Sequence, residues 1–284
     1  MNGIGGLSAT MPDKVDELRS RSYLLAVEDK EFLQKDELRA FRLALEFCKA
    51  DLALAEMGIG STVVVFGSSR ILSPEQADKK AQEARGADAL KRARQQKALS
   101  IWYQEARNFG RIVSERGGSL APEGGVRQNV IATGGGPGIM EAANRGADDA
   151  GAPSIGFNIV LPTEQEPNGY STPSLTFRFH YFAMRKMHFA MRANALAIFP
   201  GGFGTMDELF EILTLKQTRK SAPMPIILFS RSYWRKVVNF DALAALGMID
   251  PEEFGLFDIV DNAEEAWDVM VKRALPAQTP LREP

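Results

Sequence analysis

The chain has 284 residues, of which 45% are hydrophobic and 25% charged, and its formal net charge at pH 7 is -2. This length and composition allow a full buried core, so a disordered chain is excluded. No long basic block is present, which argues against an electrostatic surface for nucleic acid or for a membrane. The longest apolar runs fall far short of the roughly 20 residues of a membrane span. We therefore expect small molecules or further copies of the chain as partners.

The N-terminal segment and the cysteine content indicate a cytoplasmic location. The first twenty residues have no apolar stretch after a basic start, so no secretory signal is predicted. The single cysteine, Cys48, cannot form an internal disulfide and favours a reducing compartment. Phe41, Leu45, Cys48 and Leu52 follow at helical spacing, which predicts a buried structural thiol.

The first part of the chain is predicted to be helical and then to enter a β-α unit. We expect a loose tail over 1–12 and helices over 13–57. The β-branched run TVVVF at 62–66 predicts a strand, and a long charged helical stretch follows at about 74–115. Within it, 74–98 holds few large apolar residues and should project as a solvated helix.

The remainder alternates short apolar strands with helices. The predicted strands are 130–133, 154–160, 195–199, 225–229 and 257–260. Helices are predicted after the glycine turn at 134–138, over 181–194, from the PGGFGTMDE turn to about 216, over 233–246, and at the C-terminus through Trp267. This alternation predicts an α/β fold with a doubly wound (Rossmann-like) parallel sheet flanked by helices. Residues 1–60 would form an N-terminal helical extension, and 61–284 the domain itself.

Three of the predicted strands end in glycine-bearing turns, at 67–70, 134–141 and 200–208. The carboxyl ends of parallel strands share one edge of the sheet, so these turns should lie together. The third, PGGFGTMDE, places three glycines before a helix N-terminus, an arrangement that suits a phosphate group. It also carries Asp207 and Glu208, which a simple anion site would avoid.

The same turns exclude two common nucleotide sites. Neither glycine turn completes the G-x-G-x-x-G fingerprint, because Ile139 and Asp207 stand where the last glycine is needed. This argues against a dinucleotide oxidoreductase. No Gly-Lys dipeptide is present, so a Walker P-loop is also excluded. The remaining possibility is a site that holds a nucleoside or sugar monophosphate between facing glycine turns.

Structural alternatives exist for both glycine turns. The glycines of the second turn, Gly134, Gly135, Gly136 and Gly138, either contact a ligand or form a tight turn for steric reasons alone. Thr205 and Glu208 match the T-x-x-E capping box, in which both side chains would satisfy helix N-terminal N–H groups. Spacing in the sequence does not decide between these readings.

The helix predicted at 181–194 has two faces of different character. One holds methionines and is expected in the core: Met184, Met187 and Met191. The other would present a guanidinium to a phosphate or carboxylate, or lie in solvent: Arg185, Phe189 and Arg192. His180 and His188 have no supporting cysteine or acidic pair, so no metal site is predicted.

Four segments together resemble the LOG (Lonely guy) family of nucleoside 5'-monophosphate phosphoribohydrolases, often labelled putative lysine decarboxylases. They are FGSSR at 66–70, GGGPGIMEAANRGA at 134–147, MRK at 184–186 and PGGFGTMDE at 200–208. The resemblance covers about 62–265. It leaves the N-terminal helices outside and implies insertions near 71–98 and 118–128 of the nucleotide-binding catalytic domain.

The resemblance implies roles for individual residues. Arg185 matches the catalytic arginine and Glu208 the catalytic glutamate. The implied substrate-binding residues are Ser68, Gly135, Gly136, Gly138, Glu164, Lys186, Gly201, Gly202, Phe203, Gly204, Thr205, Met206, Asp207 and Thr214. No metal or cofactor is implied. Nothing in the chain nominates the Schiff-base lysine and carboxylate pair that a pyridoxal phosphate decarboxylase would need.

The predicted activity is hydrolysis of the N-glycosidic bond of a purine nucleoside 5'-monophosphate, AMP or a cytokinin riboside monophosphate, to free base and ribose 5-phosphate. Glu208 would stabilise positive charge on the ribose and activate water. Arg185 would assist the departing base or anchor Glu208 and the phosphate. A homo-oligomer, dimer or higher, is expected from the resemblance. The alternative is a non-catalytic nucleotide-binding sensor or carrier of the same fold.

Overall fold

The computed structural model describes residues 20–120, 124–162, 166–221 and 223–273. The chain divides into two compact units, Met1–Leu45 and Glu46–Pro284. The tail predicted at 1–12 lies outside the described residues. No described helix is both long enough and apolar enough to cross a membrane.

The first unit consists of short helical segments and the start of a longer helix. Its elements are η1 (Arg21–Tyr23), α2 (Lys30–Leu33), η2 (Asp36–Leu38) and the first turns of α3 (Arg39–Glu56). Asp29 begins α2, because its carboxylate accepts the backbone N–H of Phe32 at 3.0 Å and the Arg21 guanidinium at 2.7 Å. None of the short helices buries a residue, so local caps and ion pairs define this part of the chain.

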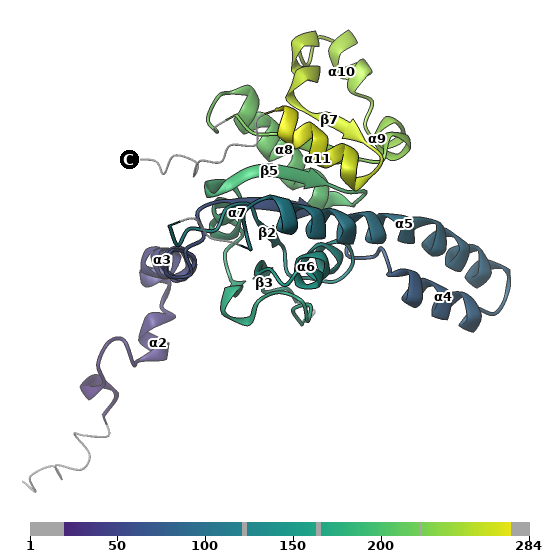
Figure 1. The fold of residues 1–284 in the computed structure, drawn as a ribbon. Helices are drawn as coiled ribbons and strands as arrows, with labels where there is room; N and C mark the ends of the chain where they lie inside the picture. The colour runs from purple at the N-terminus through teal and green to yellow at the C-terminus, as the bar shows by residue number, and fades with distance from the viewer. Residues whose placement is uncertain (1–19, 121–123, 163–165, 222, 274–284) are drawn as a thin grey trace, which may run out of the picture. The chain divides into compact units, whose positions relative to one another are not determined.

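One seven-stranded sheet forms the centre of the second unit (Figure 1). Its strands are β1 (Thr62–Phe66), β2 (Val130–Thr133), β3 (Ser154–Ile159), β4 (Thr176–Phe179), β5 (Ala193–Ile198), β6 (Ile226–Phe229) and β7 (Asp258–Val260). Their order is β4-β3-β2-β1-β5-β6-β7, and every pairing is parallel. This confirms the predicted doubly wound α/β fold. The sequence reading missed β4, whose TFRF pattern buries its two phenylalanines.

Helices cover both faces of the sheet, and strand residues alternate between two cores. Val64 and Phe66 belong to the core under α3, α7 (Phe182–Met191), α8 (Phe203–Gln217), α9 (Arg231–Val237) and α10 (Phe240–Ala245). Val63 and Val65 belong to the opposite core under α5 (Ala87–Arg116), α6 (Ile139–Asp149) and α11 (Ala263–Lys272). Because all five β1 residues are buried, a strand this apolar fits only at the centre.

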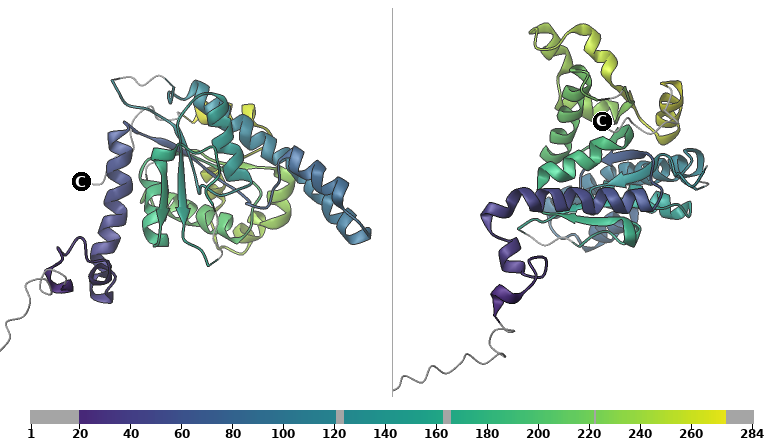
Figure 2. Two further views of the ribbon diagram at one scale, coloured as in Figure 1. Left: turned by 90° about the horizontal axis from the view of Figure 1, so that it is seen from below. Right: turned by 90° about the vertical axis from the view of Figure 1, so that its left-hand side faces the viewer.

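The charged stretch after β1 forms two helices rather than one. α4 (Pro74–Glu83) begins at a capping box made by Ser73 and Gln76, and the chain turns at Ala84–Gly86 into α5. Figure 2 shows α4 and the first turns of α5 extending past the sheet. The break falls where Gly86 adopts φ +83, a conformation that interrupts a helix. The segment at 74–98 therefore projects as predicted, but it consists of two helices and not of one continuous helix.

Two further predictions are corrected. Cys48 is exposed, and so are Phe41, Leu45 and Leu52. The sheet instead buries a neighbouring stripe of α3 that contains Ala50 and Leu54. The helix predicted at 233–246 is two helices, α9 and α10, because the Asn239 side chain accepts the N–H of Ala242 and starts a new helix.

Glycines allow α5 and α6 to cross closely. A Cβ atom at Gly110 would collide with the carbonyl oxygen of Ala143, and one at Gly146 would collide with the backbone of Arg107 and Arg111. Both neighbours are backbone atoms of the facing helix, which cannot rotate away. This crossing matters for the site because α6 begins directly after the second glycine turn.

We predict that Gly146→Ala destabilises the protein by about 1–3 kcal/mol, because overpacking outweighs the roughly 1 kcal/mol that alanine gains in a helix. The matched control is Gly255→Ala, where an added Cβ meets open space and the change should stay within about 0.5 kcal/mol. Chemical denaturation of both variants measures the difference. Equal stabilities would contradict the close crossing.

Candidate functional site

The three glycine turns meet at the carboxyl edge of the sheet, as predicted. β1 lies between β2 and β5, so the strand order reverses direction there and the helices change face. The Ser68 N–H donates to the Pro200 carbonyl at 3.0 Å, and the Ile139 N–H donates to the Ser68 carbonyl at 3.2 Å. Backbone hydrogen bonds thus join the turns after β1, β2 and β5 at the position where folds of this class bind ligands.

The glycines of the β2 turn are buried and closely packed. A Cβ at Gly134 would meet the Arg185 guanidinium, and one at Gly135 would meet the Asn158 side chain. At Gly138, with φ +73, it would meet the backbone of Ser68 and Ser69. The steric reading therefore explains these three glycines without a ligand. Gly136 is also buried.

A polar network that the sequence reading missed holds the β2 turn. Thr133 Oγ1 accepts the Gly135 N–H at 2.9 Å and donates to Asn144 Oδ1 at 2.6 Å. Asn168 donates its backbone N–H to the Gly135 carbonyl at 2.8 Å and its Nδ2 to the Gly136 carbonyl at 3.1 Å. The two asparagines lie in α6 and in the loop after β3, and their spacing in the sequence carried no signal of this network. These bonds fix the turn before any ligand arrives.

The β5 turn is built differently and leaves its surface open. Gly201 packs against the Thr205 side chain, whereas an added Cβ at Gly202 or Gly204 would meet no described atom within 4 Å. Gly202 has φ -97, a value available to any residue. Neither packing nor backbone strain among the described residues requires glycine at these two positions. The open glycines leave room for a ligand to approach the backbone.

The helix that follows rules out the capping-box reading. α8 begins at Phe203 with Gly202 as its N-cap, and no side chain caps it. Thr205 and Glu208 therefore lie inside the helix rather than at its boundary. The Met206 N–H makes a helical bond to the Gly202 carbonyl at 3.0 Å, so the N–H groups of Phe203 and Gly204 precede the first helical bond.

Glu208 is a buried carboxyl group at this edge of the sheet. It is 6% exposed, and no hydrogen bond reaches its side chain from the described residues. Burial raises its pKa to about 7, while the charges of Lys186 and Arg185 act in the opposite direction. At neutral pH the group can thus both hold and release a proton, the property that acid-base catalysis requires.

Arg185, on α7, is fixed by its surroundings. Its Nε donates to the Phe157 carbonyl at 2.7 Å, and its guanidinium carbon lies 5.1 Å from the centre of the Phe189 ring. Its guanidinium also packs against Gly134. Burial lowers its pKa and the charge of Glu208 opposes this shift, so the two candidate catalytic groups are electrostatically coupled.

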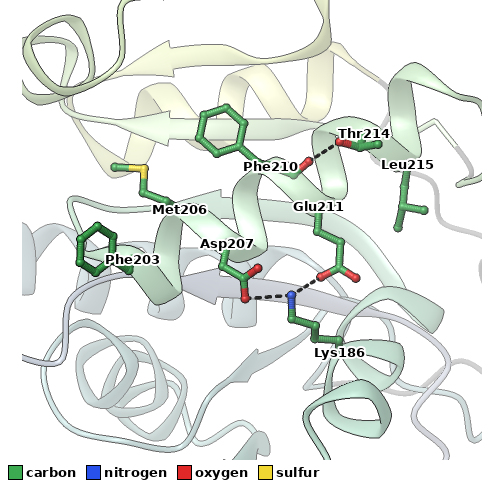
Figure 3. Close-up of a pocket in the computed structure, with 8 residues that line it drawn as sticks. All are labelled: Lys186, Phe203, Met206, Asp207, Phe210, Glu211, Thr214 and Leu215. Atoms are coloured by element: carbon green, nitrogen blue, oxygen red, sulfur yellow. Dashed lines mark hydrogen bonds and ion pairs between the residues drawn. The ribbon is translucent and has the colours of Figure 1, made fainter.

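The Lys186 side chain reaches from α7 to the face of α8 that carries Asp207 and Glu211. Its Nζ contacts Glu211 at 2.6 Å and Asp207 at 2.9 Å (Figure 3). Burial opposes protonation, but hydrogen bonds to these two carboxylates raise the lysine pKa. A groove of about 610 Å³ lies here and is lined by Lys186, Phe203, Met206, Asp207, Phe210, Glu211, Thr214 and Leu215. Glu208 and Arg185 do not line it, so the predicted residues divide between two neighbouring surfaces.

The remaining predicted residues are placed as follows. Glu164 lies outside the described residues. Arg192 is buried and paired with Asp51 at 2.6 Å. The predicted position in solvent is therefore wrong for this residue, and its guanidinium meets a carboxylate of the protein. Met187 is exposed, which corrects its assignment to the core, because α7 turns Phe189 and His188 inward instead. Among the described residues no group of three or more His, Cys, Asp or Glu side chains could hold a metal ion.

Part of this chain is similar in sequence to known proteins. The family described as "Possible lysine decarboxylase" matches residues 140–270. A protein of Oryza sativa subsp. japonica named "Probable cytokinin riboside 5'-monophosphate phosphoribohydrolase LOG4" is 27% identical over 140 residues, which span 48% of this chain and 60% of that protein. Over these matched residues the chain is similar to the LOG family.

Solved structures similar to this chain include two of the molybdenum cofactor carrier protein from Chlamydomonas reinhardtii. Each is 16% identical, with TM-scores of 0.44 and 0.45. The matches cover 75% and 76% of this chain and 96% and 99% of those chains.

We predict that Glu208→Gln stabilises the protein increasingly as pH rises. The folded protein holds the Glu208 proton up to about pH 7, while the unfolded chain releases it near 4.5. Stability is therefore lost between these pH values, by on the order of 3 kcal/mol in total, and glutamine removes this loss. Denaturation of both proteins between pH 4 and 8 measures it.

The control for this experiment is Glu56→Gln, an exposed glutamate at the end of α3. Its stability curve should run parallel to that of the wild type. A Glu208→Gln curve that is also parallel would contradict the raised pKa of the buried carboxyl.

Proposed function

We propose that the protein hydrolyses the N-glycosidic bond of a purine nucleoside 5'-monophosphate, releasing the free base and ribose 5-phosphate. The observation that carries this proposal is Glu208. A buried carboxyl group with a pKa near 7 stands one and a half turns into a helix whose N-terminus is open. A protein that only binds an anion gains nothing from this carboxylate, since it weakens anion binding.

The open start of α8 is the proposed phosphate site. N–H groups before the first helical hydrogen bond favour an anion, as does the positive end of the helix dipole. Gly202 and Gly204 would let phosphate oxygens approach these donors without a side chain in the way. The remote phosphate contacts would supply binding energy that orients the ribose toward Glu208.

Glu208 would act on the ribose. Cleavage of the bond between C1' and the base nitrogen builds positive charge on C1' and the ring oxygen, which an ionised carboxylate stabilises. The same carboxylate would accept a proton from the water that attacks C1'. The electron pair of the broken bond goes to the base nitrogen, which takes up a proton. The products are the free base and ribose 5-phosphate.

Arg185 would support the ionised form of Glu208. Its charge lowers the carboxyl pKa, as does that of Lys186, so the two cations oppose the effect of burial. Because Arg185 is held by the Phe157 carbonyl and the Phe189 ring, this charge is preorganised rather than recruited by substrate. Lys186 would reach substrate only by giving up its bonds to Asp207 and Glu211.

AMP or a cytokinin riboside monophosphate is the proposed substrate, supported by the name of the rice relative. A homodimer in the cytoplasm is proposed as well. Phe203 is 96% exposed and Phe210 39% exposed on one side of α8, and such an apolar patch favours a partner. A single cysteine fits a reducing compartment.

The test is incubation with a panel of nucleoside monophosphates, followed by quantification of free base and ribose 5-phosphate. We expect release of both from at least one purine nucleotide. Glu208→Gln should lower kcat by about 10²–10⁴-fold, the usual contribution of general acid-base catalysis. Glu56→Gln should leave kcat unchanged. Tight nucleotide binding without release of base from any member would instead identify a binding or carrier protein.

A further inference from the structure

The helix that carries Arg185 is held at both ends by side chains from α3. α7 has Tyr181 as its N-cap, and that residue's side chain makes no capping bond. The Glu46 carboxylate on α3 instead holds the two residues that lead into the helix. It accepts the backbone N–H of His180 at 2.8 Å and that of Tyr181 at 3.1 Å. A carboxylate at a helix N-terminus satisfies N–H donors and complements the helix dipole.

The opposite end of α7 is held by an ion pair. Arg192, the C-cap residue, is 4% exposed and contacts Asp51 of α3 at 2.6 Å. The Arg192 carbonyl also accepts the N–H of Thr62 at 2.7 Å, which ties this end to β1. A buried guanidinium requires a paired carboxylate, so Asp51 is needed for this arrangement.

Apolar contacts connect the two polar ones. Phe47 of α3 lies against His188 of α7, with ring centres 5.4 Å apart, and Phe157 lies against the same ring at 5.9 Å. His188 is 1% exposed. Ala50 and Leu54 of α3 are buried in the same core. The C-terminal part of α3 thus contacts α7 at His188 as well as at the two ends of the helix.

Arg185 lies between these two attachment points. It follows the N-cap Tyr181 by four residues and precedes Arg192 by seven, so a tilt or shift of α7 would move its guanidinium relative to Gly134 and Phe157. Displacements of about 1 Å at a catalytic group can cost a factor of 10² in rate. The part of α3 that makes these contacts belongs to the second unit but lies outside the stretch that resembles the LOG family, which begins near residue 62.

We propose that Glu46 and Asp51 are positioning residues of the candidate site, which hold the two ends of α7 and thereby fix Arg185 at the β2 turn. The effect on turnover rests on the proposed function. The effect on α7 does not, because it concerns only the order of the helix. The C-terminal part of α3 would then have a defined role in the site without contacting substrate.

The experiment combines hydrogen exchange with kinetics on the full chain. Glu46→Ala removes both hydrogen bonds to His180 and Tyr181 at a partly exposed position, Glu46→Gln keeps one acceptor oxygen, and Asp51→Asn removes the ion pair. Glu56→Gln, on the same helix and exposed, is the control. In Glu46→Ala, amide exchange should accelerate about 10-fold over 182–191 while the β1 and β5 amides keep their wild-type rates.

Kinetics provide the second readout. Glu46→Ala should lower kcat by about 10-fold with KM changed less than about 2-fold, and Glu46→Gln should restore part of the rate. Unchanged exchange over 182–191, or acceleration spread evenly over the whole domain, would overturn the proposal. A wild-type protein without turnover would refute the proposed function alone, since the exchange data would still decide whether the brace exists.

Discussion

Burial of the Glu208 carboxyl within the electrostatic influence of Arg185 and Lys186 is the constraint to which the rest of the site is adjusted. A carboxyl group removed from water is destabilising as an anion, and only nearby positive charge keeps ionisation within reach of neutral pH. One cation is fixed by a backbone carbonyl and an aromatic ring, and the other is paired with the carboxylates of Asp207 and Glu211. The protein thus accepts a loss of stability at the position where the proposed chemistry needs a proton acceptor.

The β2 and β5 glycine turns have different structural roles in this site. In the β2 turn, glycines permit close packing against Arg185, Asn158 and the backbone of the β1 turn. Close packing and hydrogen bonds fix the conformation of that turn. In the β5 turn, Gly202 and Gly204 face open space and leave the start of α8 accessible. Glycines that look equivalent in the sequence therefore allow close packing in the β2 turn and leave the backbone accessible to a ligand in the β5 turn.

The sequence was sufficient for the fold class because short β-branched runs alternate with helices, and a strand such as TVVVF can lie only between two layers. It was insufficient where a decision depended on the neighbours. The stripe with Cys48 has the spacing of a core face, yet the sheet buries the stripe with Ala50 and Leu54 instead. The T-x-x-E pattern could not be assigned until α8 was seen to begin at Phe203, two residues before Thr205.

The most direct measurement is a crystal structure of Glu208→Gln with AMP bound. The account predicts that the 5'-phosphate lies on the N–H groups at the start of α8, beside Gly202 and Gly204, with the ribose C1' facing residue 208 and Arg185 in its present position. A nucleotide seated in the groove beside Lys186 and Phe210, with C1' away from residue 208, would contradict it.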